Sequence, residues 1–203
     1  MKPIETERLI LRNWRDDDRD LFHEINSDEA VMRFFEFRRN RAEADAKLTQ
    51  LTNDIDRLGY GFAAVALKTT DEPIGFAGLQ NCTSLPHYKS DCIEIGWRLA
   101  ERAWRKGYAS EAAEAWLAHG FDTLMLDEIM SFAVHDNDAS TGVMRKIGMT
   151  EMPELAFDYP GIPDELAHLR RYVVYRITRR DWLDRRSGAP NRPNRSPLNP
   201  SGS

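Results

Sequence analysis

The chain has 203 residues, of which 41% are hydrophobic and 30% charged, a composition typical of one soluble globular domain. Its net charge of −5 argues against a general nucleic-acid binder and suits a cationic substrate such as an amine. No apolar run approaches the ~18 residues of a membrane span, residues 1–8 do not read as a secretory signal, and Cys82 and Cys92 have no disulfide-framework or metal-ligand spacing. We therefore expect a cytoplasmic protein without a metal site and without a membrane or nucleic-acid partner.

Hydrophobic periodicity and turn residues predict an alternation of strands and helices. Gly59 and Gly148 are predicted to end two of the helices, and the turn at 71–73 predicts a hairpin between the strands beside it. In chain order the prediction is a strand at 8–12, helices at 16–26 and 41–58, strands at 62–67, 74–81 and 92–99, a helix at 108–121, a strand at 129–134, a helix at 139–147 and a strand at 172–177. This order indicates an α/β fold with one mixed sheet flanked by helices.

The C-terminal segment differs from the rest of the chain. Residues 187–203 are rich in Pro, Asn and Ser and nearly free of apolar side chains, so we expect a disordered tail after one domain at 1–186. Residues 185–203 hold Arg185, Arg186, Arg192 and Arg195 and no acid. Nucleic-acid binding through this tail is an alternative function, which predicts salt-dependent binding that deleting 187–203 removes.

A short basic loop and a glycine precede the helix at 108–121. Unpaired amides at a helix N-terminus bind anions, and Gly107 lets the backbone approach a phosphate closely, with Arg105 and Lys106 adding positive charge. The small side chains of Ala109 and Ser110 leave room for a diphosphate. The spacing matches neither a Walker A loop nor a three-glycine dinucleotide fingerprint. The loop therefore indicates a cofactor that carries a pyrophosphate, although a helix that simply begins after a glycine gives the same pattern.

Several segments in order resemble one protein family. Four segments are similar to successive signatures of the GNAT superfamily of N-acetyltransferases: Glu-Ile-Gly-Trp (94–97), Trp-Arg-Lys-Gly-Tyr-Ala-Ser-Glu-Ala (104–112), His-Asp-Asn-Asp-Ala-Ser (135–140) and Arg-Lys-Ile-Gly-Met (145–149). The opening at 5–12 and the closing at 175–182 are typical of the branch that resembles ribosomal-protein N-terminal acetyltransferases, so the resemblance spans roughly residues 5–184.

The resemblance implies a mostly antiparallel sheet of about seven strands that splays between the fourth and fifth. Acetyl-coenzyme A would lie there, its pantetheine arm paired with backbone at Trp97, Arg98 and Leu99. Its diphosphate would lie on the amides of the loop and helix start, at Arg105, Lys106, Gly107, Tyr108, Ala109 and Ser110. The family often has Gln or Arg three residues before the glycine, where this chain has Trp104.

Three polar residues are candidates for direct roles. Glu94 is either the general base for the attacking amine or an outward-facing partner in an ion pair. Asn137 is either a coenzyme ligand, as the family match implies, or a helix N-cap. Ser140 is either the proton donor to the departing sulfur or a solvated serine in the first helical turn.

The remaining candidates are weaker. His135 follows a strand and is more often structural at such a position than catalytic. Phe34, Phe35 and Phe37 form either the acceptor wall or a core cluster. The arginine pairs at 38–39, 170–171 and 179–180 are interpreted as solvated surface.

The sequence thus predicts an N-acetyltransferase that works by direct attack of an amine on acetyl-coenzyme A in a ternary complex. Backbone N–H groups near Trp97 would stabilise the oxyanion. A non-catalytic acyl-coenzyme A sensor is the alternative, and thiol release distinguishes the two. The acceptor, either a small amine or a protein N-terminus, is left open, as is the choice between a monomer and a homodimer.

Overall fold

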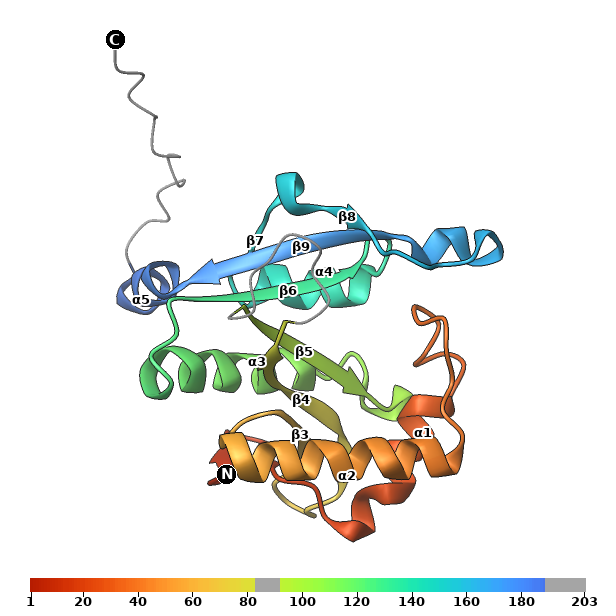
Figure 1. Cartoon of the computed structure of the whole chain (residues 1–203). Coiled ribbons are helices and arrows are strands. Elements are labelled where there is room, and N and C mark those ends of the chain that lie inside the picture. Colours follow the sequence, from red (N-terminus) through yellow and green to blue (C-terminus); the bar gives the residue numbers. More distant parts are fainter. Residues whose placement is uncertain (83–91, 189–203) are drawn as a thin grey trace.

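The computed structural model describes residues 1–82 and 92–188 (Figure 1). Within these ranges one sheet of nine strands forms the centre of the molecule. The strands are β1 (Ile4–Glu5), β2 (Leu9–Arg12), β3 (Phe62–Leu67), β4 (Pro73–Asn81), β5 (Ile93–Leu99), β6 (Glu128–Val134), β7 (Thr150–Glu151), β8 (Phe157–Asp158) and β9 (Arg171–Thr178).

Helices cover both faces of this sheet. They are α1 (Arg19–Ser27), α2 (Arg41–Leu58), α3 (Tyr108–Ala118), α4 (Asp138–Lys146) and α5 (Arg179–Ser187), with short 3₁₀ turns between elements and a π-helical turn at His119–Thr123 after α3. Helices α1 and α2 contact β3 and β4, whereas α3 contacts β2, β4 and β5. None of the helices in the described ranges combines the length and the apolar character that crossing a membrane would need.

The sheet is antiparallel except at one place. The strand order is β1-β2-β3-β4-β5-β6-β9-β7, with β8 also paired to β9. Strands β5 and β6 are parallel and share a single register pair, Glu94 with Met130, after which they separate. β4–β5 and β6–β9, by contrast, are paired over seven positions each. The predicted mixed, mostly antiparallel fold that splays between the fourth and fifth predicted strands is confirmed.

Most predicted elements are confirmed, some to the residue. Helix α2 spans the predicted 41–58, since Asn40 and Glu43 form a capping box at its start and Gly59 ends it in the left-handed conformation, φ 82°. Gly148 ends the α4 segment with φ 84°. The predicted hairpin joins β3 and β4, and its turn lies over residues 68–72.

Helix α5 was not predicted. Its residues are almost all polar, and Trp182 is its one buried side chain, so the helix has little hydrophobic periodicity to detect. Ser187 ends this helix and Gly188 caps it, so the folded part continues to residue 188 and the expected boundary at 186/187 is early. The rest of the expected tail, 189–203, lies outside the described residues.

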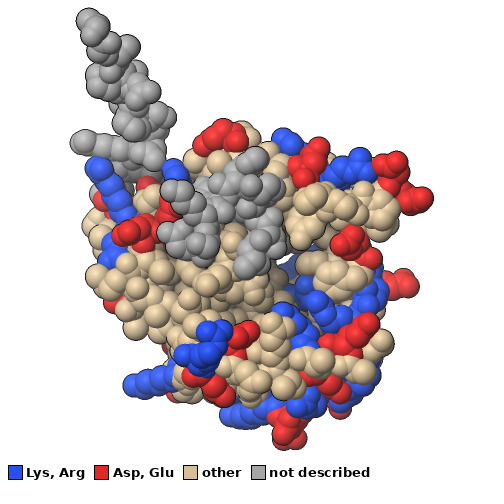
Figure 2. Space-filling view, in the orientation of Figure 1, with Lys and Arg blue, Asp and Glu red and all other residues tan. Residues whose placement is uncertain are grey.

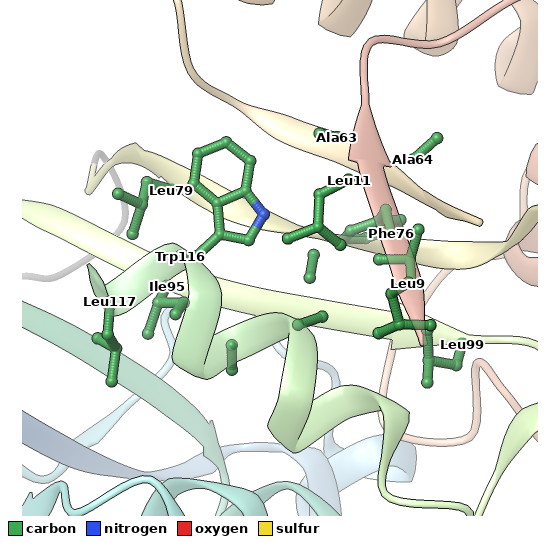
Figure 3. Packing of buried hydrophobic residues seen from close by; sticks show 14 of the residues in the cluster. Leu9, Leu11, Ala63, Ala64, Phe76, Leu79, Ile95, Leu99, Trp116 and Leu117 are labelled. Carbon is green, nitrogen blue, oxygen red and sulfur yellow. The ribbon is translucent and has the colours of Figure 1, made fainter. Parts of the chain in front are cut away.

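The core joins α3 to the sheet (Figure 3). Trp116 and Leu117 of α3 are fully buried against the sheet face that carries Leu79 and Ile95. Burying an aliphatic or aromatic side chain of this size stabilises a fold by about 1.5–3 kcal/mol. This packing fixes the start of α3 relative to the end of β5, two places on which the candidate site depends.

Candidate functional site

The separation of β5 from β6 opens a cleft of about 400 Å³. Its walls include residues 94–98 of β5 and 131–134 of β6, and it extends from the 34–39 segment between α1 and α2 to the start of α4. Figure 2 shows this face hollowed between the half that carries α1 and α2 and the half that carries β8 and β9, with basic side chains in the hollow. The cleft is therefore formed by the same break in pairing that defines the fold.

Glu94 lies at the closed end of the cleft, at the last pairing between β5 and β6. The side chain is half-buried and accepts a hydrogen bond from Gln80 Nε2 on β4. Nearby, Ser131 Oγ of β6 donates to the Ile95 carbonyl at 2.9 Å, which ties the two strands together just before they part. Burial raises the pKa of Glu94 to about 7, although the Gln80 hydrogen bond acts in the opposite direction. A carboxyl group with such a pKa can accept a proton near neutral pH, and the ion pair expected as an alternative does not form with any described residue.

Alternation along β5 places its side chains on two faces. Ile93, Ile95 and Leu99 are buried in the core beneath α3. Glu94, Gly96 and Arg98 therefore share the opposite face, towards α1 and α2. Gly96 leaves space between the two charged residues, and a Cβ there would lie 3.0 Å from the Phe62 ring.

A run of unpaired amides follows β5. No described backbone or side-chain group accepts a hydrogen bond from the N–H groups of residues 105–110, whereas Trp104 N and Glu111 N are bonded to the Glu101 and Gly107 carbonyls. Arg105 and Gly107 have positive φ, 59° and 81°, and Gly107 is the N-cap of α3. Consecutive N–H groups in such a turn, at a helix N-terminus, form a concave anion site.

Arg8 of the β1–β2 segment holds this loop in place. Its guanidinium donates to the Lys106 carbonyl at 3.0 Å, pairs with Glu111 at 2.6 Å and lies over the Tyr108 ring at 4.7 Å. Thr6 Oγ1 also donates to Glu111 at 2.6 Å. A Cβ on Gly107 would lie 3.4 Å from Arg8 Nη2, an ordinary contact with the end of a flexible side chain. Sequence reasoning did not identify Arg8, because a contact between residue 8 and residue 107 is visible only in the fold.

Some main-chain groups on the β5 edge that faces the gap are free to form hydrogen bonds, and one is already bonded. Beyond Glu94, β6 no longer pairs with it, so main-chain groups near Trp97 and Arg98 are open on that side. The Leu99 carbonyl, however, accepts the indole N–H of Trp104 at 2.8 Å. The aromatic residue that departs from the family pattern thus anchors the loop to the end of β5.

Both polar candidates on α4 lie at the cleft. Asn137 is the N-cap of α4, and its Oδ1 accepts from Ser140 N at 3.2 Å. The N-cap interpretation is therefore confirmed, while its Nδ2 has no partner among the described residues. Ser140 is half-buried and lines the cleft, so it is not a serine on the outer surface.

The aromatic cluster at residues 34–37 also lines the cleft. Phe34 packs towards Val134, Ile162 and Leu169, and Phe35 lies 5.8 Å from Phe37 between ring centroids. The opposite wall is aromatic as well, where the Tyr172 ring contacts those of Phe132 and Tyr159. Phe34 therefore packs on the core and lines the cleft, whereas Phe35 and Phe37 line the cleft without belonging to a described core cluster. Their role as an acceptor wall stays a prediction.

The interpretation of the arginine pairs as solvated surface is wrong for several members. Arg39 is half-buried in the cleft, where its Nη1 donates to Asn26 Oδ1 at 3.0 Å. Arg179 donates through Nε and Nη2 to the Leu126 carbonyl, at 3.0 and 2.8 Å. Arg170 holds the Ile162 carbonyl at 3.1 Å. Long side chains can bury their stems and bond carbonyls, which the charge pattern alone does not reveal.

Arg98 is the charged group that sequence reasoning did not single out as a side chain. Its Nη1 donates to the same Asn26 Oδ1 at 2.6 Å, and its guanidinium lies 4.3 Å from the Phe35 centroid and 5.3 Å from that of Phe76. Burial, with Arg39 and Arg38 nearby, lowers its pKa to about 9. The cleft contains both signs of charge, since Arg39 and Arg98 line it together with Glu36 and Glu94.

His135 does not contribute to the cleft walls. It is exposed after β6, and its backbone N–H donates to the Arg171 carbonyl at 2.9 Å. Among the described residues, no three His, Cys, Asp or Glu side chains gather as metal ligands would.

Comparison with known proteins agrees with this geometry. The family model for the acetyltransferase (GNAT) domain matches residues 8–150. A Bacillus subtilis (strain 168) protein described as the uncharacterized N-acetyltransferase YnaD is 33% identical over 146 residues, which cover 72% of this chain and 81% of that protein.

Solved structures have the same fold. A GNAT-family acetyltransferase from Bacillus anthracis superposes with a TM-score of 0.73 at 25% identity, covering 88% of this chain and 99% of that one. The ribosomal L7/L12 α-N-protein acetyltransferase RimL, solved in complex with coenzyme A, superposes with a TM-score of 0.70 at 15% identity, covering 87% of this chain and 98% of that one.

The fold is that of a solved GNAT-family acetyltransferase, and the family model matches more than half of this chain. The chain belongs to the GNAT acetyltransferase family. It is an acetyl-coenzyme A-dependent acetyltransferase, and members of this family act on amine acceptors.

Proposed function

We propose that this protein transfers the acetyl group of acetyl-coenzyme A to a primary amine by direct attack within a ternary complex. The observation that carries the proposal is the break in the sheet: β5 and β6 part immediately after Glu94, so a carboxyl group with a raised pKa stands at the end of an open strand edge. Such an arrangement can hold two substrates next to one base, and positioning of this kind supplies much of the rate in acyl transfer.

Acetyl-coenzyme A supplies an activated thioester carbonyl when bound. The free amides of residues 105–110, with Arg105 and Lys106, would bind its diphosphate, and the β5 edge at Trp97, Arg98 and Leu99 would bind its pantetheine arm. The fit is supported by Gly107, which has no Cβ and whose positive φ of 81° belongs to the turn that carries the free amides. Asn137 Nδ2 is a further donor at the cleft.

Glu94 would remove the proton that the attacking amine loses. A primary amine of the lysine type has a pKa of about 10.4 and is mostly protonated at neutral pH, whereas attack requires its lone pair. Because burial raises the pKa of Glu94 to about 7, this carboxylate is a stronger base than an exposed glutamate. It takes the proton directly or through a water molecule.

Ser140 and the β5 backbone would complete the chemistry. Backbone N–H groups near Trp97 face the gap and would stabilise the negative charge that develops on the carbonyl oxygen. Ser140, in the first turn of α4, would donate a hydrogen bond to the departing sulfur, which finally takes its proton from water or from protonated Glu94. The thiol has a pKa of only about 8.5, so this last contribution is small.

Thiol release tests the proposal. The full chain is incubated with acetyl-coenzyme A and a panel of small amines and short peptides with free N-termini, while free thiol and acetylated product are measured together. We expect stoichiometric thiol and acetylated amine with at least one acceptor. Saturable coenzyme binding without acceptor-dependent thiol release across the panel would favour an acyl-coenzyme A sensor instead.

A further inference from the structure

We propose that the acceptor amine also carries an anionic group, a carboxylate or a phosphate, which Arg98 and Arg39 bind at the α1 end of the cleft. The inference rests on the proposed function, because it names the class of amine that the same cleft accepts. It adds an anionic group to the cationic amine that the net charge of the chain suits.

The two guanidiniums converge on one neutral oxygen. Arg98 Nη1 and Arg39 Nη1 both donate to Asn26 Oδ1, at 2.6 and 3.0 Å. Asn26 is itself buried, 1% exposed, and its Nδ2 donates to the Phe22 carbonyl at 2.7 Å, which fixes the orientation of the amide. The three side chains come from β5, from the segment before α2 and from α1, and only the tertiary fold brings them together.

Within residues 1–82 and 92–188, no carboxylate balances these two charges through an ion pair. Arg98 Nε is fully buried without an acceptor, and no hydrogen bond reaches Nη2 of either arginine. Glu43 interacts favourably with Arg39 at longer range, but burial outweighs it and the pKa of Arg39 is lowered. Two partly desolvated guanidiniums that share one carboxamide oxygen leave N–H donors available to an anion.

Aromatic rings orient the Arg98 guanidinium without neutralising it. It lies against the faces of Phe35 and Phe76, at 4.3 and 5.3 Å, and Arg39 lies over Phe37 at 4.3 Å. Stacking holds a guanidinium by its faces and leaves its N–H edge for a planar anion. This is the arrangement expected of a fork that recognises a carboxylate or a phosphate.

The position of the pair relative to Glu94 sets the shape of the acceptor. Glu94 and Arg98 are four residues apart on one face of β5, so their Cα atoms are about 13 Å apart along the strand. Both side chains line the cleft, and the cleft walls include several aromatic rings. An amine and an anion at opposite ends of a short apolar or aromatic body would match this distribution.

Direct binding tests the anion site without requiring turnover. Benzoate, phenyl phosphate and the uncharged benzamide are titrated by calorimetry into the coenzyme A-saturated protein and into Arg98→Met and Arg39→Met. Methionine keeps an unbranched apolar stem against the phenylalanine rings but has no charge. Arg57→Met, on an exposed arginine of α2, is the matched control.

We expect benzoate or phenyl phosphate to bind at least about 10-fold more tightly than benzamide, since hydrogen bonds to a charged group are worth about 10-fold or more. This preference should be lost in both cleft variants and kept in Arg57→Met. The stronger of the two anions identifies the group. Equal affinity for benzamide, or an anion preference that survives both substitutions, would overturn the inference.

Kinetics separate an anion-binding role from a structural one. If amines are acetylated, para-aminomethylbenzoate should exceed para-aminomethylbenzamide by roughly 10- to 100-fold in kcat/KM, mostly through KM, and Arg98→Met should bring the two close together while Arg98→Lys restores part of the difference. A variant that loses activity equally on both acceptors would mean that Arg98 only supports the fold. Failure to acetylate any amine would count against the proposed function, and the calorimetry would still decide the anion site.

Discussion

The two ends of the cleft region are built in different ways. The proposed coenzyme end is made of backbone groups from one continuous segment, residues 104–111, braced by Arg8. The proposed acceptor end is made of side chains from separate segments, with Arg39 and Arg98 meeting at Asn26. A site made of local backbone needs a particular local sequence, whereas a site of converging side chains can change one residue at a time. This difference explains how a family can keep one cofactor and vary its acceptors.

The largest effect on activity is expected from replacing Glu94, which lies between the two ends of the cleft region. Glu94→Gln keeps the size of the side chain and an oxygen that can accept from Gln80, but it removes the base. We expect kcat/KM for the amine to fall by about 10²–10⁴ while the coenzyme Kd is unchanged. Steady-state kinetics and calorimetry measure the two quantities. Glu154→Gln, at an exposed site, serves as the control, and a loss of less than about 5-fold at Glu94 would assign the base elsewhere.

Gly107→Glu should weaken coenzyme binding and leave the proposed acceptor end of the cleft unchanged. The substitution places bulk and negative charge where the diphosphate would lie, so we expect coenzyme affinity to fall by at least about 100-fold. Gly59→Glu is a matched control, because Gly59 has nearly the same φ, 82° against 81°, and nothing within 4 Å of its Cβ position. Normal coenzyme binding by Gly107→Glu, measured by calorimetry, would move the diphosphate site away from α3.

The pH dependence of kcat/KM should reflect the ionisation of Glu94. Because its pKa is raised to about 7, the carboxylate is lost as pH falls, and kcat/KM calculated for the neutral form of the amine should drop about 10-fold per unit below pH 7 in the wild type but not in Glu94→Gln. The same shift affects stability. A carboxyl group whose folded pKa lies above its ordinary 4.5 favours folding while protonated, and this contribution is lost as pH rises through about 7.

Thermal unfolding gives a second measurement of the same group. Glu94→Gln should match the wild-type Tm near pH 4 and exceed it at pH 8, because glutamine cannot ionise. A wild type whose stability relative to this variant does not change between these pH values would show that Glu94 ionises as an ordinary exposed glutamate does.

Ser140→Ala should have the smallest effect. A thiol with a pKa near 8.5 leaves readily without help, so we expect kcat to fall only about 2- to 10-fold with coenzyme affinity unchanged. Backbone bonding is preserved, since Asn137 accepts from the N–H of residue 140 and not from its hydroxyl. Single-turnover acetylation measures the effect, and a loss approaching that of Glu94→Gln would give Ser140 a larger role than assigned.

The same contrast explains what the sequence could and could not predict. Helix α2 was predicted to the residue because Asn40, Glu43 and Gly59 are local signals at its two ends. The anion site proposed at the loop 104–110 could be predicted from the sequence for the same reason, because the residues that form it are adjacent in the chain. The contact of Arg39 and Arg98 with Asn26 could not be predicted, because it depends on three segments that only the tertiary fold brings together. Arg39 was therefore interpreted as surface, and Arg98 only as strand backbone.

Hydrogen exchange with and without coenzyme A tests whether the coenzyme lies along β5 and on the amides before α3. We predict that saturating coenzyme A slows exchange in two segments, residues 96–99 and 105–110, while the far β1–β3 side of the sheet is unchanged. Protection confined to other segments, or no change at residues 105–110, would place the coenzyme elsewhere on the protein.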